Sequence, residues 1–137
     1  MKPKILLDTG PLVAFLNQTD AYHVWAKTQL SLIAQPMLTC EAVITEACYL
    51  LRAQKEGPAA ILQCLQRGLI TIEFAVTEEA KAVQALMARY ANLPMSFADA
   101  CLVRMAEQIG DSVILTLDSD FQVYRKHSRQ VIPLMMP

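Results

Sequence analysis

The feature that most constrains the fold is an alternation along the chain between short apolar runs and longer amphipathic ones. Strand-type runs lie at residues 4–7, 37–39, 69–74, 112–116 and 131–134. The pattern predicts helices over residues 41–54, 59–67, 77–90 and 96–109, and a helical stretch that continues from the turn at Pro11 to about residue 33. Strands that alternate with helices in this way predict an α/β fold, a parallel sheet covered by helices on both faces.

Length and charge further limit the classes of protein to which the chain can belong. The 137 residues contain no internal repeat or linker, so we expect a single domain over residues 1–137. Twelve Lys and Arg against 13 Asp and Glu give a formal net charge of -1, so any contact with nucleic acid must come from a local patch. No run approaches the ~20 apolar residues of a membrane span, and the N-terminal apolar run is too short for a signal peptide. We therefore expect a cytoplasmic protein that does not contact membranes.

Apolar residues are unusually common for a chain with so few charges. The hydrophobic fraction is 54%, while charged residues make up 18%. Such a composition indicates that part of the apolar surface is covered by another chain. The sequence therefore predicts a homodimer or a complex with a small partner protein.

Two carboxylates come directly after predicted strands. Asp8 follows the run at 4–7, and Asp118 follows the run at 112–116. In open parallel sheets, ligands bind at the carboxyl ends of the strands near a topological switch point, so both acids stand where a site is expected. Each also has an ordinary explanation, because Asp8 can cap the next helix and Asp118 can be a turn residue together with Asp120.

Two further carboxylates interrupt apolar helix faces. Glu46 shares its face with Val43 and Leu50, so it stands among apolar residues; a half-exposed edge position is the alternative. Asp99 stands one helical turn from Val103, but Ser96 and Asp99 also fit a capping box. Capping explains Asp99 as well as a functional role does.

The four separated carboxylates, taken together, favour a cation site. A pair of carboxylates at ~4 Å repels by about 4 kcal/mol at an effective dielectric near 20, and a bound cation removes that cost. Ligands that are all hard oxygens favour Mg²⁺ or Mn²⁺ over zinc. Such an ion can activate water for phosphodiester hydrolysis without a serine, cysteine or histidine nucleophile.

The segments around these acids resemble the motifs of PIN-domain ribonucleases, and especially those of VapC-type toxins from prokaryotic toxin–antitoxin pairs. The matching segments are residues 6–12 (LLDTGPL), 44–51 (ITEACYLL), 96–102 (SFADACL) and 115–121 (LTLDSDF). The resemblance extends over essentially the whole chain. It implies a five-stranded parallel sheet, dependence on Mg²⁺ or Mn²⁺, endonucleolytic cleavage of RNA, a homodimer and, for a toxin, an antitoxin partner.

The resemblance also assigns roles to individual residues. It implies four catalytic acids, namely Asp8, Glu46, Asp99 and Asp118. Asp8, Asp99 and Asp118 are the implied metal ligands. It further implies an accessory acid at Asp120 and a hydroxyl beside the metal at Thr116.

Basic residues suggest where RNA could bind. Arg125 and Lys126 belong to a cluster that can contact phosphate, and Arg104 lies a little over one helical turn beyond Asp99. A solvated surface run explains the cluster equally well.

Other doubly wound folds with acids at strand ends fit less well. A receiver-type domain needs an acidic pair after the first strand and a lysine after the fifth. A haloacid-dehalogenase-type phosphatase needs an aspartate pair, D-x-D, after the first strand, whereas this chain has Asp8-Thr9-Gly10. The resemblance therefore implies a metal-dependent endoribonuclease that acts as a toxin. The alternative is a catalytically silent PIN-like scaffold that binds RNA or protein.

Overall fold

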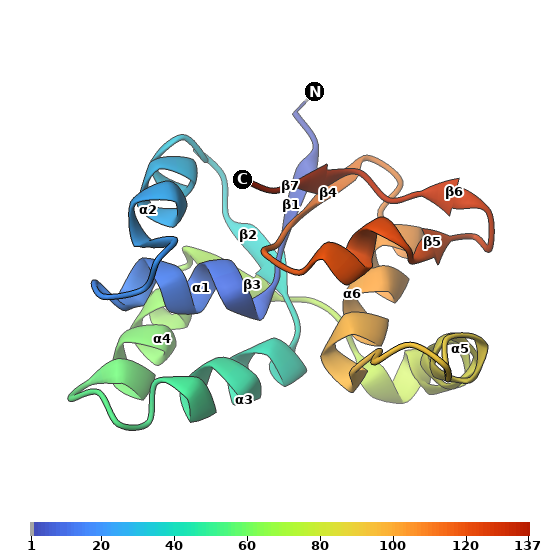
Figure 1. Ribbon diagram of the computed structural model, residues 1–137, viewed down its shortest axis with the longest axis horizontal. Coiled ribbons are helices and arrows are strands. Elements are labelled where there is room, and N and C mark those ends of the chain that lie inside the picture. The colour runs from blue at the N-terminus through green and yellow to red at the C-terminus, as the bar shows by residue number, and fades with distance from the viewer. Residues whose placement is uncertain (1) are drawn as a thin grey trace.

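The computed structural model describes residues 2–137 and is built around one parallel sheet (Figure 1). Its strands are β1 (Lys4–Leu7), β2 (Met37–Thr39), β3 (Ile70–Ile72), β4 (Ser112–Leu115) and β7 (Leu134–Met135). They lie in the order β3-β2-β1-β4-β7, and every neighbouring pair is parallel. The predicted α/β fold with a five-stranded parallel sheet is therefore confirmed.

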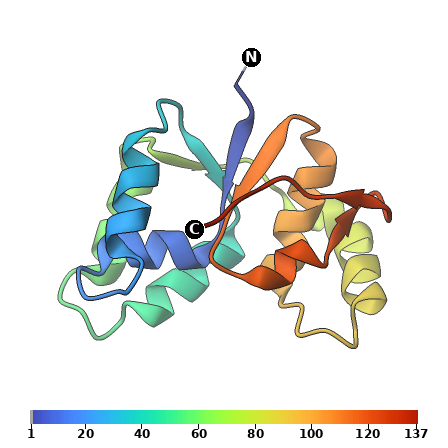
Figure 2. The ribbon, with the colours of Figure 1, turned by 45° about the horizontal axis from the view of Figure 1, so that its top comes forward.

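Helices cover the sheet on both sides. They are α1 (Thr9–Leu16), α2 (His23–Ser31), α3 (Glu41–Leu50), α4 (Gly57–Gln66), α5 (Val76–Arg89) and α6 (Phe97–Gln108). Figure 2 shows α1 to α4, in blue and green, on one side of the strands, and α5 and α6, in yellow and orange, on the other. This division follows from the strand order, because right-handed crossovers from β1 to β3 and from β3 back to β4 place their helices on opposite faces. Within residues 2–137, no helix combines the length and apolar character needed to cross a membrane.

Two predicted helices are shorter than the sequence suggested. The helical stretch predicted from Pro11 to residue 33 is interrupted after Leu16, where the side chains of Asn17 and Asp20 accept hydrogen bonds from backbone amides two residues ahead. The helix predicted over residues 41–54 ends at Leu50. Gly57 then begins α4, where a Cβ atom would lie 2.4 Å from the carbonyl oxygen of Leu51, so only glycine allows this close approach.

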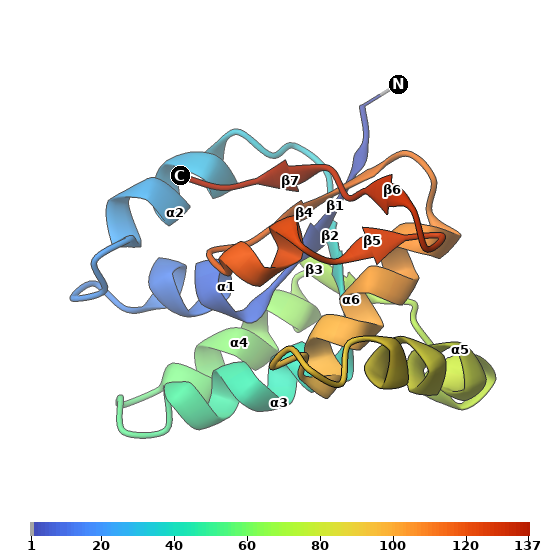
Figure 3. The ribbon, with the colours of Figure 1, turned by 45° about the vertical axis from the view of Figure 1, so that its right-hand side comes forward.

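The predicted last strand is also displaced. Within the predicted range 131–134, Val131 belongs to β6 (Gln130–Val131), which pairs antiparallel with β5 (Arg125–Lys126) outside the main sheet. Figures 1 and 3 show this hairpin at the side of the molecule, next to α6. The strand that completes the sheet is β7, which begins three residues after the predicted start and ends one residue after the predicted end. Periodicity does not separate the two short strands because both lie within one apolar run.

The core lies between β1, β4 and α6. The side chains of Leu6, Leu7, Ile114 and Leu115 are completely buried. Helix α6 is buried over most of its length and carries Asp99 in its buried part. Strands β2 and β3 are added on one side of β1, whereas β4 and β7 are added on the other side. The topological switch point therefore lies at the carboxyl ends of β1 and β4.

Candidate active site

A hollow of about 420 Å³ opens at the carboxyl ends of β1 and β4. It is lined by residues from the end of β1 and the start of α1, from α3, from α6 and from the segment after β4: Asp8, Thr9, Gly10, Glu46, Leu50, Asp99, Leu117, Asp118 and Ser119. The fold thus brings the carboxylates of all four separate motifs to the wall of one hollow.

Asp8 is held at the end of β1 by two hydrogen bonds. The backbone amide of Thr9 donates to its Oδ1 at 2.8 Å, which is the N-cap of α1, and the hydroxyl of Thr116 donates to its Oδ2 at 2.7 Å. Thr116 is completely buried and also accepts a hydrogen bond from the amide of Asp118, at 2.9 Å. The Thr116 hydroxyl therefore links the residues that follow β1 and β4. Asp8 both caps α1 and lines the hollow.

Asp118 and Asp120 differ in position. Asp118 caps the short 3₁₀ helix Ser119–Gln122, because its Oδ1 accepts the amide of Asp120 at 2.9 Å. Asp120 is half-buried and is not among the residues that line the hollow. The structure brings Asp118 to the site but leaves the predicted accessory acid outside the wall.

Glu46 stands on an exposed face of α3. Its Oε2 accepts the hydroxyl of Thr9 at 3.2 Å, which ties it to the start of α1. The buried face of α3 carries Val43 and Ala47, whereas Leu50, one turn beyond Glu46, is half exposed. The prediction that Glu46 interrupts a buried apolar stripe was therefore wrong, because the helix turns its apolar residues to two different faces. Glu46 lies at the solvent side of the hollow.

Asp99 combines the two roles that its sequence left open. The capping box is present: the amide of Asp99 donates to Ser96 Oγ at 3.0 Å, and the amide of Ser96 donates to Asp99 Oδ2 at 3.4 Å. The same Oδ2 accepts the hydroxyl of Tyr124 at 3.0 Å, and the residue lines the hollow. The sequence did not predict a role for Tyr124, because the residues around it do not indicate a carboxylate partner that is distant in the sequence.

Burial and mutual repulsion raise the pKa values of two of these carboxyl groups. Burial raises the pKa of Asp8 to about 6; the charges of Asp99 and Asp118 add to this, while the hydrogen bonds from Thr116 and Thr9 oppose it. Burial also raises the pKa of Asp99, again with a contribution from Asp118, although the hydrogen bond from Tyr124 opposes it. The acids are thus close enough to repel one another, and a cation would relieve this repulsion.

The donor set fits a hard divalent cation. All of the carboxylates at the hollow offer oxygen atoms, as Mg²⁺ and Mn²⁺ prefer. Among residues 2–137, no three His, Cys, Asp or Glu side chains are arranged closely enough to enclose an ion as they stand.

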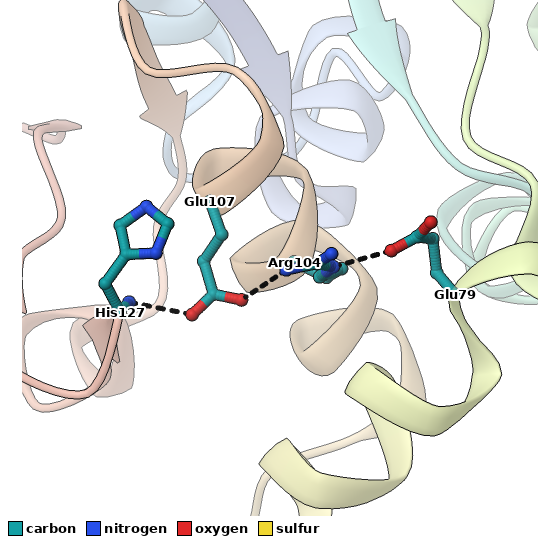
Figure 4. Close-up of polar contacts among 4 residues, drawn as sticks. All are labelled: Glu79, Arg104, Glu107 and His127. Carbon is teal, nitrogen blue, oxygen red and sulfur yellow. Dashed lines mark hydrogen bonds and ion pairs between the residues drawn. The ribbon is translucent and has the colours of Figure 1, made fainter.

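The predicted RNA-binding residues have partners within the chain. Arg104 forms ion pairs with Glu79 at 2.7 Å and with Glu107 at 3.2 Å (Figure 4). The Arg125 guanidinium donates to the backbone carbonyls of residues 122–124. Lys126 is buried, with its Nζ 3.5 Å from the carbonyl oxygen of Gly110. None of the three lines the hollow, so the structure does not bring them to the acidic site.

Comparison with known proteins gives the family. The family model of the PIN domain matches residues 5–127. The chain belongs to the PIN domain family. The resemblance seen in the four motifs is therefore confirmed, and the hollow lies at the carboxyl edge of the sheet of a PIN domain.

Two solved structures share this fold. Mycobacterium tuberculosis VapC20, described as a toxin that cleaves the sarcin–ricin loop, has a TM-score of 0.80 and 22% sequence identity over 95% of this chain and 100% of that one. A DNA-bound VapBC from Salmonella typhimurium has a TM-score of 0.55 and 17% identity, over 99% of this chain and 98% of that one. No curated protein sequence matches the chain significantly. At these identities the structural likeness establishes a shared fold.

Proposed function

We propose that this PIN domain is a divalent-metal-dependent endoribonuclease. The observation that carries the proposal is the hollow at the switch point, lined by Asp8, Glu46, Asp99 and Asp118. Within residues 2–137, no cationic side chain lines the hollow. Burial, with a smaller contribution from the charges of Asp99 and Asp118, raises the pKa of Asp8. A site of this kind is suited to a cation and to a substrate that brings phosphate oxygens to that cation.

The proposed roles follow from the positions of the side chains. Asp8, Asp99 and Asp118 would hold Mg²⁺ or Mn²⁺, which when bound activates water and stabilises the leaving oxygen. Thr116 fixes Asp8 through its hydroxyl and so keeps the first ligand in place. Glu46, on the solvent side, is placed to accept a proton from water that enters the hollow.

We further propose that the nuclease is the toxin of a toxin–antitoxin pair and acts on cytoplasmic RNA. The shared fold with VapC20, a toxin that cleaves an RNA loop, and with the VapBC complex supports this proposal. Several large apolar side chains are also exposed, among them Val24, Leu32, Tyr49 and Val131. Such surface is suited to a partner chain, either an antitoxin or a second copy in a homodimer.

The test is cleavage of structured RNA by the purified protein under defined metal conditions. We expect cleavage with Mg²⁺ or Mn²⁺, none in EDTA, and recovery when excess Mn²⁺ is added. Zinc should support cleavage poorly because the ligands are all hard oxygens. Asp118→Asn should lower the rate by orders of magnitude, because placing the metal is the catalytic step that the protein controls.

The matched control is Asp111→Asn, which removes the same charge from an exposed position outside the hollow. This variant should cleave at the rate of the unchanged protein. Undiminished cleavage in EDTA would contradict the metal mechanism. Binding of RNA without cleavage under every metal condition would instead support a silent scaffold.

A further inference from the structure

Tyr124 lies directly behind the wall of the acidic hollow. Its side chain is completely buried, and its ring packs edge-on against Tyr90, at 5.1 Å between ring centroids, and against Phe121, at 5.3 Å. Its hydroxyl is the polar end of this aromatic cluster and lies 3.0 Å from Asp99 Oδ2. A phenol that faces an ionised carboxylate can only donate, so the direction of this hydrogen bond is fixed.

This hydrogen bond distinguishes the two oxygens of Asp99. Oδ2 accepts the hydroxyl of Tyr124 and, at the longer distance of 3.4 Å, the amide of Ser96. Within residues 2–137, Oδ1 accepts no hydrogen bond. Since Asp99 lines the hollow, one oxygen is held on the protein side and the other is left for a ligand.

Tyr124 is itself held in place by its surroundings. The amide of the next residue, Arg125, donates to the hydroxyl of Tyr90 at 2.9 Å. Two residues further along, the amide of His127 donates to Glu107 at 2.7 Å, and Glu107 is paired with Arg104 (Figure 4). The segment that follows Tyr124 is therefore held by Tyr90, at the C-terminal end of α5, and by Glu107 of α6.

We propose that Tyr124 is a positioning residue for the metal site: its hydroxyl fixes the Asp99 carboxylate so that Oδ1 is presented to the hollow. This inference rests on the proposed metal-dependent cleavage. Partners that orient a metal ligand from behind commonly contribute about 10- to 100-fold to metal affinity or activity. The competing explanation is that a buried tyrosine merely needs an acceptor for its hydroxyl.

The test compares Tyr124→Phe with Tyr22→Phe. Both variants keep the aromatic ring and remove one hydroxyl, but Tyr22 is 46% exposed and lies outside the hollow. Mn²⁺ affinity is measured by titration calorimetry without RNA, and kcat and KM are measured with a defined RNA. Each variant is assayed well below its own melting midpoint, so that a less stable protein is compared in its folded state.

We expect Tyr124→Phe to bind Mn²⁺ about tenfold more weakly and to lose kcat to a similar extent, with little change in KM for RNA. Tyr22→Phe should keep the Mn²⁺ affinity and the kcat of the unchanged protein. Equal Mn²⁺ affinity in the unchanged protein and in Tyr124→Phe would overturn the positioning role and leave the proposed nuclease intact. If the unchanged protein neither binds Mn²⁺ nor cleaves RNA, the proposed function fails, and the role of Tyr124 fails with it.

Discussion

At the scale of single residues, Asp8 shows how the burial of an acid that lines the hollow can oppose folding. The residue is 6% exposed, and its carboxylate accepts hydrogen bonds from the amide of Thr9 and the hydroxyl of Thr116. These two hydrogen bonds favour the ionised form, yet burial outweighs them and raises the pKa to about 6. Without a cation, the ionised form of Asp8 is therefore less favourable in the folded protein than in the unfolded chain.

This shift predicts the pH dependence of stability. The folded-state pKa of Asp8, about 6, lies above the ordinary aspartate value of 3.8, so the folded state binds the proton more tightly. Stability should fall as the pH rises from about 4 to about 6 and then level off, with a cost of at most roughly 3 kcal/mol from this group. Asp8→Asn removes that cost, and the variant should be more stable than the unchanged protein at pH 7 in EDTA.

Urea unfolding in EDTA between pH 4 and 8 measures this difference. The advantage of Asp8→Asn should shrink towards pH 4, where the unchanged protein is already protonated at this site. Added Mn²⁺ should stabilise the unchanged protein much more than the variant, because the ion binds the folded state. A variant that is less stable than the unchanged protein at pH 7 would show that the hydrogen bonds to Asp8 outweigh its burial.

At the scale of the element, the start of α6 serves both the helix and the site. Ser96 and Asp99 close a capping box, and the residue that closes it also lines the hollow. The acid at this position favours the helix start because it lies near the positive end of the helix dipole. If Asp99 only caps the helix, the protein should tolerate asparagine at position 99. If Asp99 is a metal ligand, it should not.

Two substitutions at this helix start separate the cap from the site. Ser96→Ala removes the side-chain cap and should cost about 1 kcal/mol of stability while RNA cleavage persists. Asp99→Asn also weakens the cap but relieves repulsion with the neighbouring acids, so the metal-free protein should keep or gain stability while cleavage falls by orders of magnitude.

Thermal melts with EDTA and with Mg²⁺, together with the cleavage assay, distinguish these outcomes. Equal stabilisation by Mg²⁺ in Asp99→Asn and in the unchanged protein, with cleavage retained, would mean that Asp99 is only a cap.

At the scale of the whole molecule, the distribution of apolar surface favours assembly. Val24 on α2 is 75% exposed and Tyr49 on α3 is 61% exposed. Where large apolar side chains are exposed side by side, they commonly mark a surface that another chain covers. The charged side chains Arg104 and Arg125, by contrast, are engaged within the chain.

We therefore expect a homodimer in solution or a complex with a small antitoxin. Light scattering at tens of micromolar, an order-of-magnitude choice suited to weak interfaces, should give about twice the mass of the 15.2 kDa chain. Substituting an exposed apolar residue, as in Val24→Ser, should shift the mass towards the monomer if α2 contributes to the interface. A monomer at this concentration would argue against self-association and leave the antitoxin as the expected partner.

The sequence by itself determined the features that depend on local order. Apolar periodicity and chain order predicted the parallel sheet. The three-residue spacing of Ser96 and Asp99 predicted their capping box. The place of Asp8 and Asp118 followed from a general rule, because the carboxyl ends of parallel strands meet at one edge. Each of these features needs only a short segment and its position in the fold.

Tertiary structure alone decided the contacts between distant segments. The hydrogen bond between Tyr124 and Asp99 joins residues 25 positions apart, and that between Thr116 and Asp8 spans 108 positions. The exposure of Glu46 and the ion pairs of Arg104 likewise depend on how α3, α5 and α6 pack. The packing of whole helices and strands decides which distant side chains contact each other. The sequence around either residue therefore does not predict its partner.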